Sequence, residues 1–289
     1  MTIKKQDLAV PFPVPLLGEP YVSVGCPVIA AATGLTIHVS CAIDDVTDTT
    51  DVKIGSPRLR RACLRALRAA GISGTVSFSF PMPLPFSGPP KWAGAEADML
   101  SVAASLYLAG SEAVEPIAPS LLKGADDRTF IDLLRAMTSL SGGFVAGRRG
   151  EGLVSIDGNV DAALHATLVR RRRSVRPILG RFSAAYPELA DPFWHIVGHL
   201  VLQGIDAIRA GDAPMLGRLM TLESRLSLAV GLSDERDLLR LSRSMPSLGC
   251  KPVRGDGLSG GLHLIGPGMP HPPGRPILNF TQVGITHDG

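Results

Sequence analysis

The feature of this sequence that most limits its fold is the order in which strand-like and helix-like segments occur. The first third holds short segments rich in β-branched residues and separated by turn-forming residues: Tyr21–Val24, Val28–Ala31 and Leu35–Cys41. Residues 191–244 instead give three stretches in which apolar side chains recur at helical spacing. Strands and helices thus come in blocks, without a regular alternation, and this order predicts an α+β fold.

A helix, a strand and a loop follow the first strands. In residues 56–70 apolar side chains fall at helical spacing with arginines on the other side, and Pro57 suits a first turn. Residues 75–80 alternate with a period of two and predict a strand. A proline- and glycine-rich stretch then leads into a helical run, Asp98–Leu108. A strand, a loop and a helix N-terminus in this order predict a site for an anion.

The remaining chain predicts further elements of both kinds. Residues 127–140 read as a helix and residues 142–156 as a hairpin. Ser233 is the expected N-cap of the third helix within residues 191–244. Strands are expected at Leu262–Ile265 and at Ile277–Ile285.

Composition and charge exclude several classes of protein. With 289 residues, of which 45% are hydrophobic, the chain can bury a large core. Its 29 basic and 26 acidic residues give a net charge of +3, which is too slight to indicate a nucleic-acid or membrane partner. Apolar runs fall short of the roughly 20 residues that a membrane-spanning helix needs.

Prolines and cysteines indicate where the protein resides. Near the N-terminus Pro11, Pro13 and Pro15 interrupt an apolar run, so we interpret it as mature protein rather than a secretory signal. The cysteines are widely spaced and form no CxxC pair: Cys26, Cys41, Cys63 and Cys250. This spacing predicts buried free thiols in a reducing compartment, and we expect a cytoplasmic location.

Two long segments carry a family pattern. LLGE at 16–19 and VSVGCPVIAAATGL at 22–35 resemble the opening segment of the GHMP kinase superfamily. Residues 186–244, from YPELADPF to LRLSRS, resemble the helical half of archaeal-type mevalonate kinases, and a glycine-rich turn at 255–261 follows in the family order. With this turn the resemblance covers nearly the whole chain.

The resemblance implies an architecture and a chemistry. The expected fold is an α+β GHMP kinase fold, with a ribosomal-protein-S5-like domain at 1–155 and a ferredoxin-like domain at 156–289. A homodimer is the expected assembly. In family members that are kinases, the implied cofactors are ATP and Mg²⁺. A small phosphorylated or carboxylated metabolite is the expected ligand class.

Several chemical positions of the family hold other residues in this chain. The implied lysine of the opening strand falls on Pro13, and the implied histidine after the GlyGlu pair falls on Pro20. Counting back from the paired glycines at 142–143, the implied catalytic aspartate falls on Arg135, with Asp132 one helical turn away. Arg135 and Asp132 are therefore candidate catalytic residues, although ordinary phosphoryl transfer relies on the missing groups.

The phosphate loop has also changed. Where the resemblance implies a GLGSS run, this chain has AGAEA at 93–97. Glu96 falls where triphosphate oxygens are expected, and a carboxylate repels phosphate unless a metal intervenes. We take Glu96 as a third catalytic candidate and Lys91, Trp92 and Gly94 as ligand-binding candidates. Trp92 has two interpretations, stacking on an aromatic ligand or filling the former nucleotide pocket.

A basic residue and the closing glycines complete the candidate set. The threonine that the resemblance implies before the last glycine-rich loop aligns near Arg254, a candidate for binding phosphate. The glycines of that loop are candidates through their place in the family order: Gly255, Gly257 and Gly260. The run Arg170–Arg173 is interpreted as a solvated helix face or as a phosphate-binding arm.

His195 and His199 stand four residues apart on an expected helix. This spacing suits a metal ion, but Ile, Val and Gly lie between them where a metalloprotease motif has its glutamate. We interpret the pair as part of a helix face and predict no metal site.

Three functional hypotheses follow. The first is a repurposed cleft that binds or transforms a phosphorylated or carboxylated metabolite through arginines. The second is an active ATP-dependent kinase for a small alcohol such as mevalonate, with Glu96, Asp98 or Asp132 as its acidic groups. The third is a non-catalytic binding or assembly partner. An acidic pair beside an open phosphate loop favours the second, and a cleft filled by Trp92 favours the third.

Overall fold

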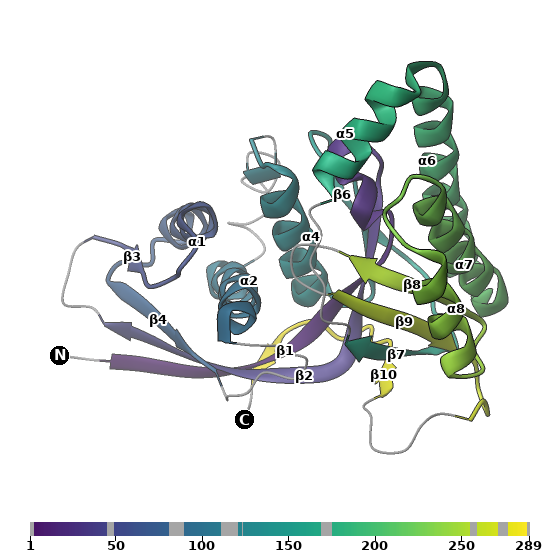
Figure 1. Cartoon of the computed structure of the whole chain (residues 1–289). Helices are drawn as coiled ribbons and strands as arrows, with labels where there is room; N and C mark the ends of the chain where they lie inside the picture. The colour runs from purple at the N-terminus through teal and green to yellow at the C-terminus, as the bar shows by residue number, and fades with distance from the viewer. Residues whose placement is uncertain are drawn as a thin grey trace.

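The computed structural model describes residues 3–44, 49–80, 90–110, 121–122, 124–168, 175–254, 259–270 and 277–287. For residues 3–4, 90–96, 166–168, 253–254 and 259–260 the description covers the backbone alone. Within these ranges the strands form two sheets (Figure 1). The first sheet contains β1 (Ile3–Leu17), β2 (Val28–Asp44), β3 (Asp51–Val52), β4 (Thr75–Ser79), β5 (Phe144–Gly147), β6 (Leu153–Ile156) and β11 (Thr286–His287). The second contains β7 (Ala163–Leu168), β8 (Gly249–Arg254), β9 (Ser259–Ile265) and β10 (Ile277–Asn279).

The helices divide between the two sheets. Those of the first half are η1 (Glu19–Val24, a 3₁₀ helix), α1 (Pro57–Ala69), α2 (Pro90–Ala109) and α4 (Asp127–Ser141). Those of the second half are α5 (Arg176–Ala185), α6 (Pro187–Arg209), α7 (Ala213–Ala229) and α8 (Glu235–Ser244). In Figure 1, α1, α2 and α4 lie over one face of the first sheet, and α6, α7 and α8 lie beside the second.

The two longest strands of the first sheet, β1 and β2, form an antiparallel hairpin at its centre. The strand order is β11-β1-β2-β4-β3, and β5 pairs with β2 and then with β6. The second sheet has the order β10-β7-β9-β8. Because β11 returns to β1, the last described residues of the chain belong to the first sheet.

The alternating prolines of β1 have a structural explanation. Residues of the same parity in a strand direct their backbone groups to the same edge. The Pro11 carbonyl accepts a hydrogen bond from Ser139 Oγ at 2.7 Å, and the Pro13 carbonyl accepts one from Arg135 Nη2 at 3.4 Å. Both donors lie on α4, four residues apart. Prolines therefore suit this edge of β1, where α4 supplies side-chain donors to the carbonyls and a proline adds no N–H group.

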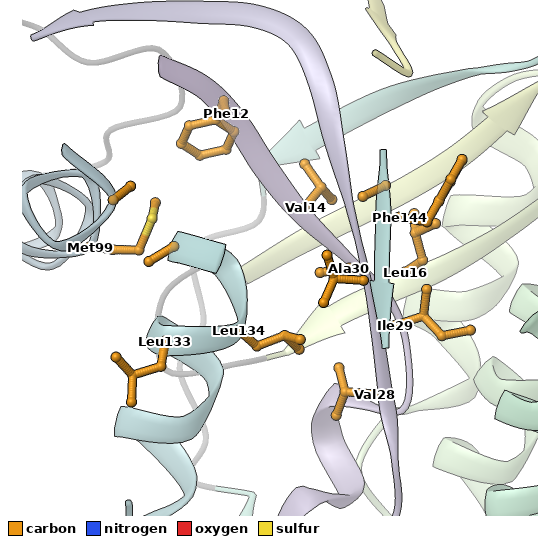
Figure 2. Packing of buried hydrophobic residues seen from close by; sticks show 14 of the residues in the cluster. Phe12, Val14, Leu16, Val28, Ile29, Ala30, Met99, Leu133, Leu134 and Phe144 are labelled. Carbon is orange, nitrogen blue, oxygen red and sulfur yellow. The ribbon is translucent and has the colours of Figure 1, made fainter. Parts of the chain in front are cut away.

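The main hydrophobic core lies between the first sheet and its helices. Figure 2 shows Phe12 and Val14 of β1 on the same side of the strands as Leu133 and Leu134 of α4, with Leu16 on the other side beside Phe144. All of these side chains are at most 2% exposed. On α1 the buried side chains recur at helical spacing from Leu59 to Leu67, as expected for an amphipathic helix. The core continues into α6, α7 and the second sheet, so the two halves share one buried cluster.

A buried polar contact also joins the halves. Glu223 of α7 forms an ion pair with Lys251 of β8 at 2.7 Å, and both side chains are 2% exposed. The other carboxylate oxygen of Glu223 accepts the backbone N–H of Gly18, also at 2.7 Å. One turn later on α7, Ser227 Oγ lies 2.9 Å from the hydroxyl of Tyr21. Helix α7 thereby fixes the turn between β1 and β2.

Several sequence predictions are confirmed. The helices expected at 56–70 and 127–140 are α1 and α4, the strand at 75–80 is β4, and the hairpin at 142–156 is β5 with β6. Each of the four cysteines is buried and free: Cys26, Cys41, Cys63 and Cys250. Among the described residues, helices that combine the length and the apolar character needed to cross a bilayer are absent.

Other predictions are wrong, each for a local reason. Tyr21–Val24 is not a strand but η1, because Gly18 and Gly25 at positive φ bend the chain on both sides of it. The strands expected at 28–31 and 35–41 are one strand, β2. The N-cap of α8 is Asp234 instead of Ser233, since its carboxylate accepts the N–H of Asp237. Of the strand expected at Ile277–Ile285 only Ile277–Asn279 is one, as β10, and the next strand, β11, begins after this range at Thr286.

Candidate functional site

The expected phosphate loop is partly helical. Helix α2 begins at Pro90, so Lys91, Trp92, Gly94 and Glu96 lie in its first turns rather than in a loop that ends near Asp98. Proline is favoured in the first turn of a helix and alanine has the highest helix propensity, which explains the early start. The positions of these four side chains, and the hypothesis that Trp92 fills the cleft, lie outside the described residues.

The closing loop is described only at its two ends. Arg254 ends β8 and pairs with Ser259 of β9, and Gly260 pairs with Val253. Gly255 and Gly257 lie outside the described residues, as does the run Arg170–Arg173. The contribution of these residues to a ligand site therefore stays a prediction.

Arg135 is buried against β1 rather than open to a cleft. Its side chain is 3% exposed, and its Nη2 donates to the carbonyl of Pro13 at 3.4 Å. Its Cζ lies 5.6 Å from the centroid of the Phe12 ring, within the range of a cation–π contact. The guanidinium thus connects α4 to β1, and a catalytic role for Arg135 stays a prediction.

A cavity of about 670 Å³ opens where the first turns of α1 and α4 meet α2. Its charged lining consists of equal numbers of arginines and aspartates: Arg58, Arg61, Arg128, Asp98, Asp126 and Asp132. Asp132 is thus the one of the three predicted catalytic residues that the described structure places in this cavity. We refer to it below as the α1–α4 cavity.

Asp98 organises the wall of the α1–α4 cavity. Its two carboxylate oxygens accept the N–H groups of Gly55 at 2.9 Å and Ser56 at 2.8 Å, just before α1. Ser56 in turn caps α1 by accepting the N–H of Leu59. Burial raises the pKa of the Asp98 carboxyl, while the two backbone hydrogen bonds act in the opposite direction.

Two ion pairs line the α1–α4 cavity, one between α1 and the N-cap of α4 and one within α4. Arg58 pairs with Asp126, and Arg128 lies 4.0 Å from Asp132 on the next turn of α4. The Asp132 side chain is 15% exposed, so it faces the cavity without being open to bulk solvent. Arginines in the first turns of α1 and α4 place positive charge at the positive ends of the helix dipoles, which is unfavourable. A bound anion would offset this repulsion.

A second cavity, of about 430 Å³, lies between the turn after η1 and one face of α6. His195 and His199 both line it, together with Trp194 and Arg148. Both histidines are exposed on one face of α6, as expected from the sequence, and this face borders the cavity. We refer to it as the α6 cavity.

Solved structures with this arrangement of elements identify the architecture. Mevalonate diphosphate decarboxylase from Staphylococcus aureus matches with a TM-score of 0.64 and 13% identity, covering 100% of this chain and 99% of the other. Mevalonate kinase from L. major matches with a TM-score of 0.57 and 18% identity, covering 91% and 87%. Mevalonate kinase from Methanococcus jannaschii matches with a TM-score of 0.57 and 14% identity, covering 91% and 90%.

The chain has the GHMP kinase fold. At these identities the likeness establishes the fold and nothing finer. No protein-family model matches the sequence, and a search of curated proteins finds no match. The GHMP fold includes both a kinase and a decarboxylase among these neighbours, so the residues of the site must decide the chemistry.

The arginines of the α1–α4 cavity escaped the sequence analysis. Arg58 and Arg61 belong to an amphipathic helix whose arginines read as its solvated side, and Arg128 opens a helix about 70 positions later. One sequence feature could have indicated an anion site here: α1 has no acidic residue in its first turn, where acidic residues are normally favoured. Their convergence, however, depends on how α1 and α4 pack.

Proposed function

We propose that this protein uses a GHMP fold to bind a small phosphorylated or carboxylated metabolite in the α1–α4 cavity, and that it does not carry out ordinary GHMP kinase chemistry. The observation that carries the second part is the contact between Arg135 and Pro13. The resemblance implies an aspartate and a lysine at these two positions. A buried guanidinium on a proline carbonyl provides neither the carboxylate nor the mobile cation that phosphoryl transfer uses.

The charges of the α1–α4 cavity support an anionic ligand. Arg58, Arg61 and Arg128 reach it from the first turns of two helices. Guanidinium groups bind carboxylate and phosphate oxygens in a bidentate way, and the two helix N-termini add partial positive charge. Because Asp126 and Asp132 already pair with two of these arginines, a ligand anion competes with them, and we expect selective rather than tight binding.

ATP with Mg²⁺, which the fold family implies, does not fit the residues around Pro13. Arg135 brings a buried positive charge to the place where a carboxylate is implied. Transfer of a phosphoryl group at this position therefore lacks the acidic group that orients the hydroxyl nucleophile.

One observation favours a second candidate, an ATP-dependent kinase for a small alcohol. Asp98 and Asp132 line the same cavity beside α2, and carboxylate oxygens are the ligands that Mg²⁺ prefers. In this reading Asp132 takes the place of the missing aspartate. A direct test of Mg-ATP binding separates the two candidates.

The experiment is a thermal-shift screen of phosphorylated and carboxylated metabolites, run beside calorimetric titration with Mg-ATP. A ligand present at 100 times its Kd stabilises the folded state by about 2.7 kcal/mol, which a shift in Tm detects. Arg61→Gln removes one cavity cation, and Arg68→Gln removes an exposed arginine from the last turn of the same helix as a matched control.

The proposal predicts stabilising hits that weaken in Arg61→Gln and persist in Arg68→Gln, with no Mg-ATP binding. Saturable Mg-ATP binding that is lost in Asp132→Asn would replace the first candidate by the kinase. If no metabolite in the screen raises Tm, the first candidate fails, and if Mg-ATP does not bind either, both fail.

A further inference from the structure

One face of α6 presents metal-binding side chains to the α6 cavity. His195 and His199 stand one helical turn apart, and Asp191 stands one turn before them. All three line the same cavity of about 430 Å³. Side chains four residues apart on a helix have Cβ atoms about 5–6 Å apart, which two imidazoles can bridge through one metal ion.

The opposite wall is held in place and offers polar groups. Arg148, from the turn between β5 and β6, donates through Nε to the Gly25 carbonyl at 2.6 Å. Its Nη1 donates to Glu151 at 2.8 Å. These contacts fix the loop after η1 opposite α6, so the cavity is a shaped concavity and not the bare surface of a helix.

The cysteine of this cavity does not compete for the ion. The Cys26 thiol donates to the Trp194 carbonyl at 3.5 Å, and burial raises its pKa to about 12. Cys26 is also only 3% exposed, so its sulfur is less accessible to an ion than the two exposed histidines. The available ligands are thus imidazole nitrogens and carboxylate oxygens, which select Zn²⁺, Cu²⁺ or Ni²⁺ over softer ions.

We propose that the α6 cavity is a binding site for a divalent transition-metal ion, held by His195 and His199 with Asp191 as the neighbouring carboxylate. Among the residues that the structure describes, no group of three or more metal-binding side chains is already assembled. The protein therefore supplies two nitrogens, and water or a small anion completes the coordination. The site is separate from the α1–α4 cavity and does not depend on the function proposed there.

Titration of the tag-free protein with Zn²⁺, Cu²⁺ and Ni²⁺ by calorimetry tests the proposal. We expect saturable binding of one ion per chain, tightest for Cu²⁺ because of the general order of stability of such complexes. His195→Ala and His199→Ala should each abolish saturable binding. Asp191→Asn should weaken binding by about 10-fold if the carboxylate supports the site. His38→Ala, an exposed histidine of β2, is the matched control.

Loss of binding must arise from the ligands and not from unfolding. His195 and His199 are both exposed, so far-UV circular dichroism and Tm of both variants should match the parent protein. Cu²⁺ electron paramagnetic resonance should show nitrogen hyperfine coupling that disappears in the variants. Either the absence of saturable binding, or binding that survives both histidine substitutions, overturns the proposal.

Discussion

Replacing Lys251 by methionine is expected to destabilise the protein strongly, because it removes the partner of a buried carboxylate. Lys251 and Glu223 are both 2% exposed and their charged atoms are 2.7 Å apart. Methionine fills a similar volume but removes the cation beside the Glu223 charge, which keeps the hydrogen bond from the Gly18 N–H. Breaking a buried ion pair from one side typically costs about 3–5 kcal/mol.

This loss is a large share of the stability of an ordinary domain, which is about 5–15 kcal/mol. Urea unfolding followed by far-UV circular dichroism measures it through the shift in the transition midpoint. Lys53→Met, at an exposed lysine, is the control and should change the free energy of unfolding by less than about 0.5 kcal/mol.

A double variant separates the uncompensated charge from lost packing. Glu223→Gln keeps an oxygen that can accept from Gly18 but has no charge. The variant Lys251→Met with Glu223→Gln should therefore be more stable than Lys251→Met alone, and the two changes should not add. A cost below about 1 kcal/mol for Lys251→Met, as for an exposed pair, would refute the reasoning, as would strict additivity.

Three further predictions concern single positions. Gly18→Ala should destabilise the protein, as urea unfolding would show, because the new Cβ meets the Pro27 carbonyl oxygen at 2.0 Å and the residue sits at a φ of +84°; an unchanged midpoint would contradict this. Ser139→Ala should cost about 1–3 kcal/mol, because it leaves the buried Pro11 carbonyl without this donor at 2.7 Å, whereas exposed Ser79→Ala should cost little. Burial, with a smaller contribution from His165, lowers the pKa of His263 to about 4. The unfolded chain therefore takes up this proton first, so stability should be fully present above about pH 6.5 and fall between there and pH 4, and His263→Gln should flatten this part of the stability profile.

Elements whose periodicity agrees with their packing could be predicted from the sequence. In α1 the apolar spacing from Leu59 to Leu67 is the face that is buried, so periodicity alone found it. At η1 the β-branched valines pointed to a strand, but turns at Gly18 and Gly25 and the packing of Tyr21 decided the conformation. Local propensity was overridden there by tertiary contacts.

The candidate site was less accessible to sequence reasoning. The family resemblance placed Arg135 and Pro13 at positions of chemical interest, but only the packing of α4 on β1 shows that they touch each other. Arg61 and Arg128 are far apart along the chain and meet because two helix N-termini converge. The metal site proposed at His195 and His199 depends on the loop after η1, which lines the same cavity and is distant in the sequence.

The prolines of β1 also bear on how copies of this chain behave toward one another. A strand from a neighbouring molecule can add to a sheet edge only where that edge offers free N–H and C=O groups. Along Pro11, Pro13 and Pro15 the strand has no N–H to offer, and α4 already occupies the carbonyls of Pro11 and Pro13. The hairpin that builds the first sheet is thereby prevented, over this stretch, from acting as a template for intermolecular β-structure. Substituting these prolines by residues with an N–H group would remove a safeguard against aggregation, even where the fold itself is retained.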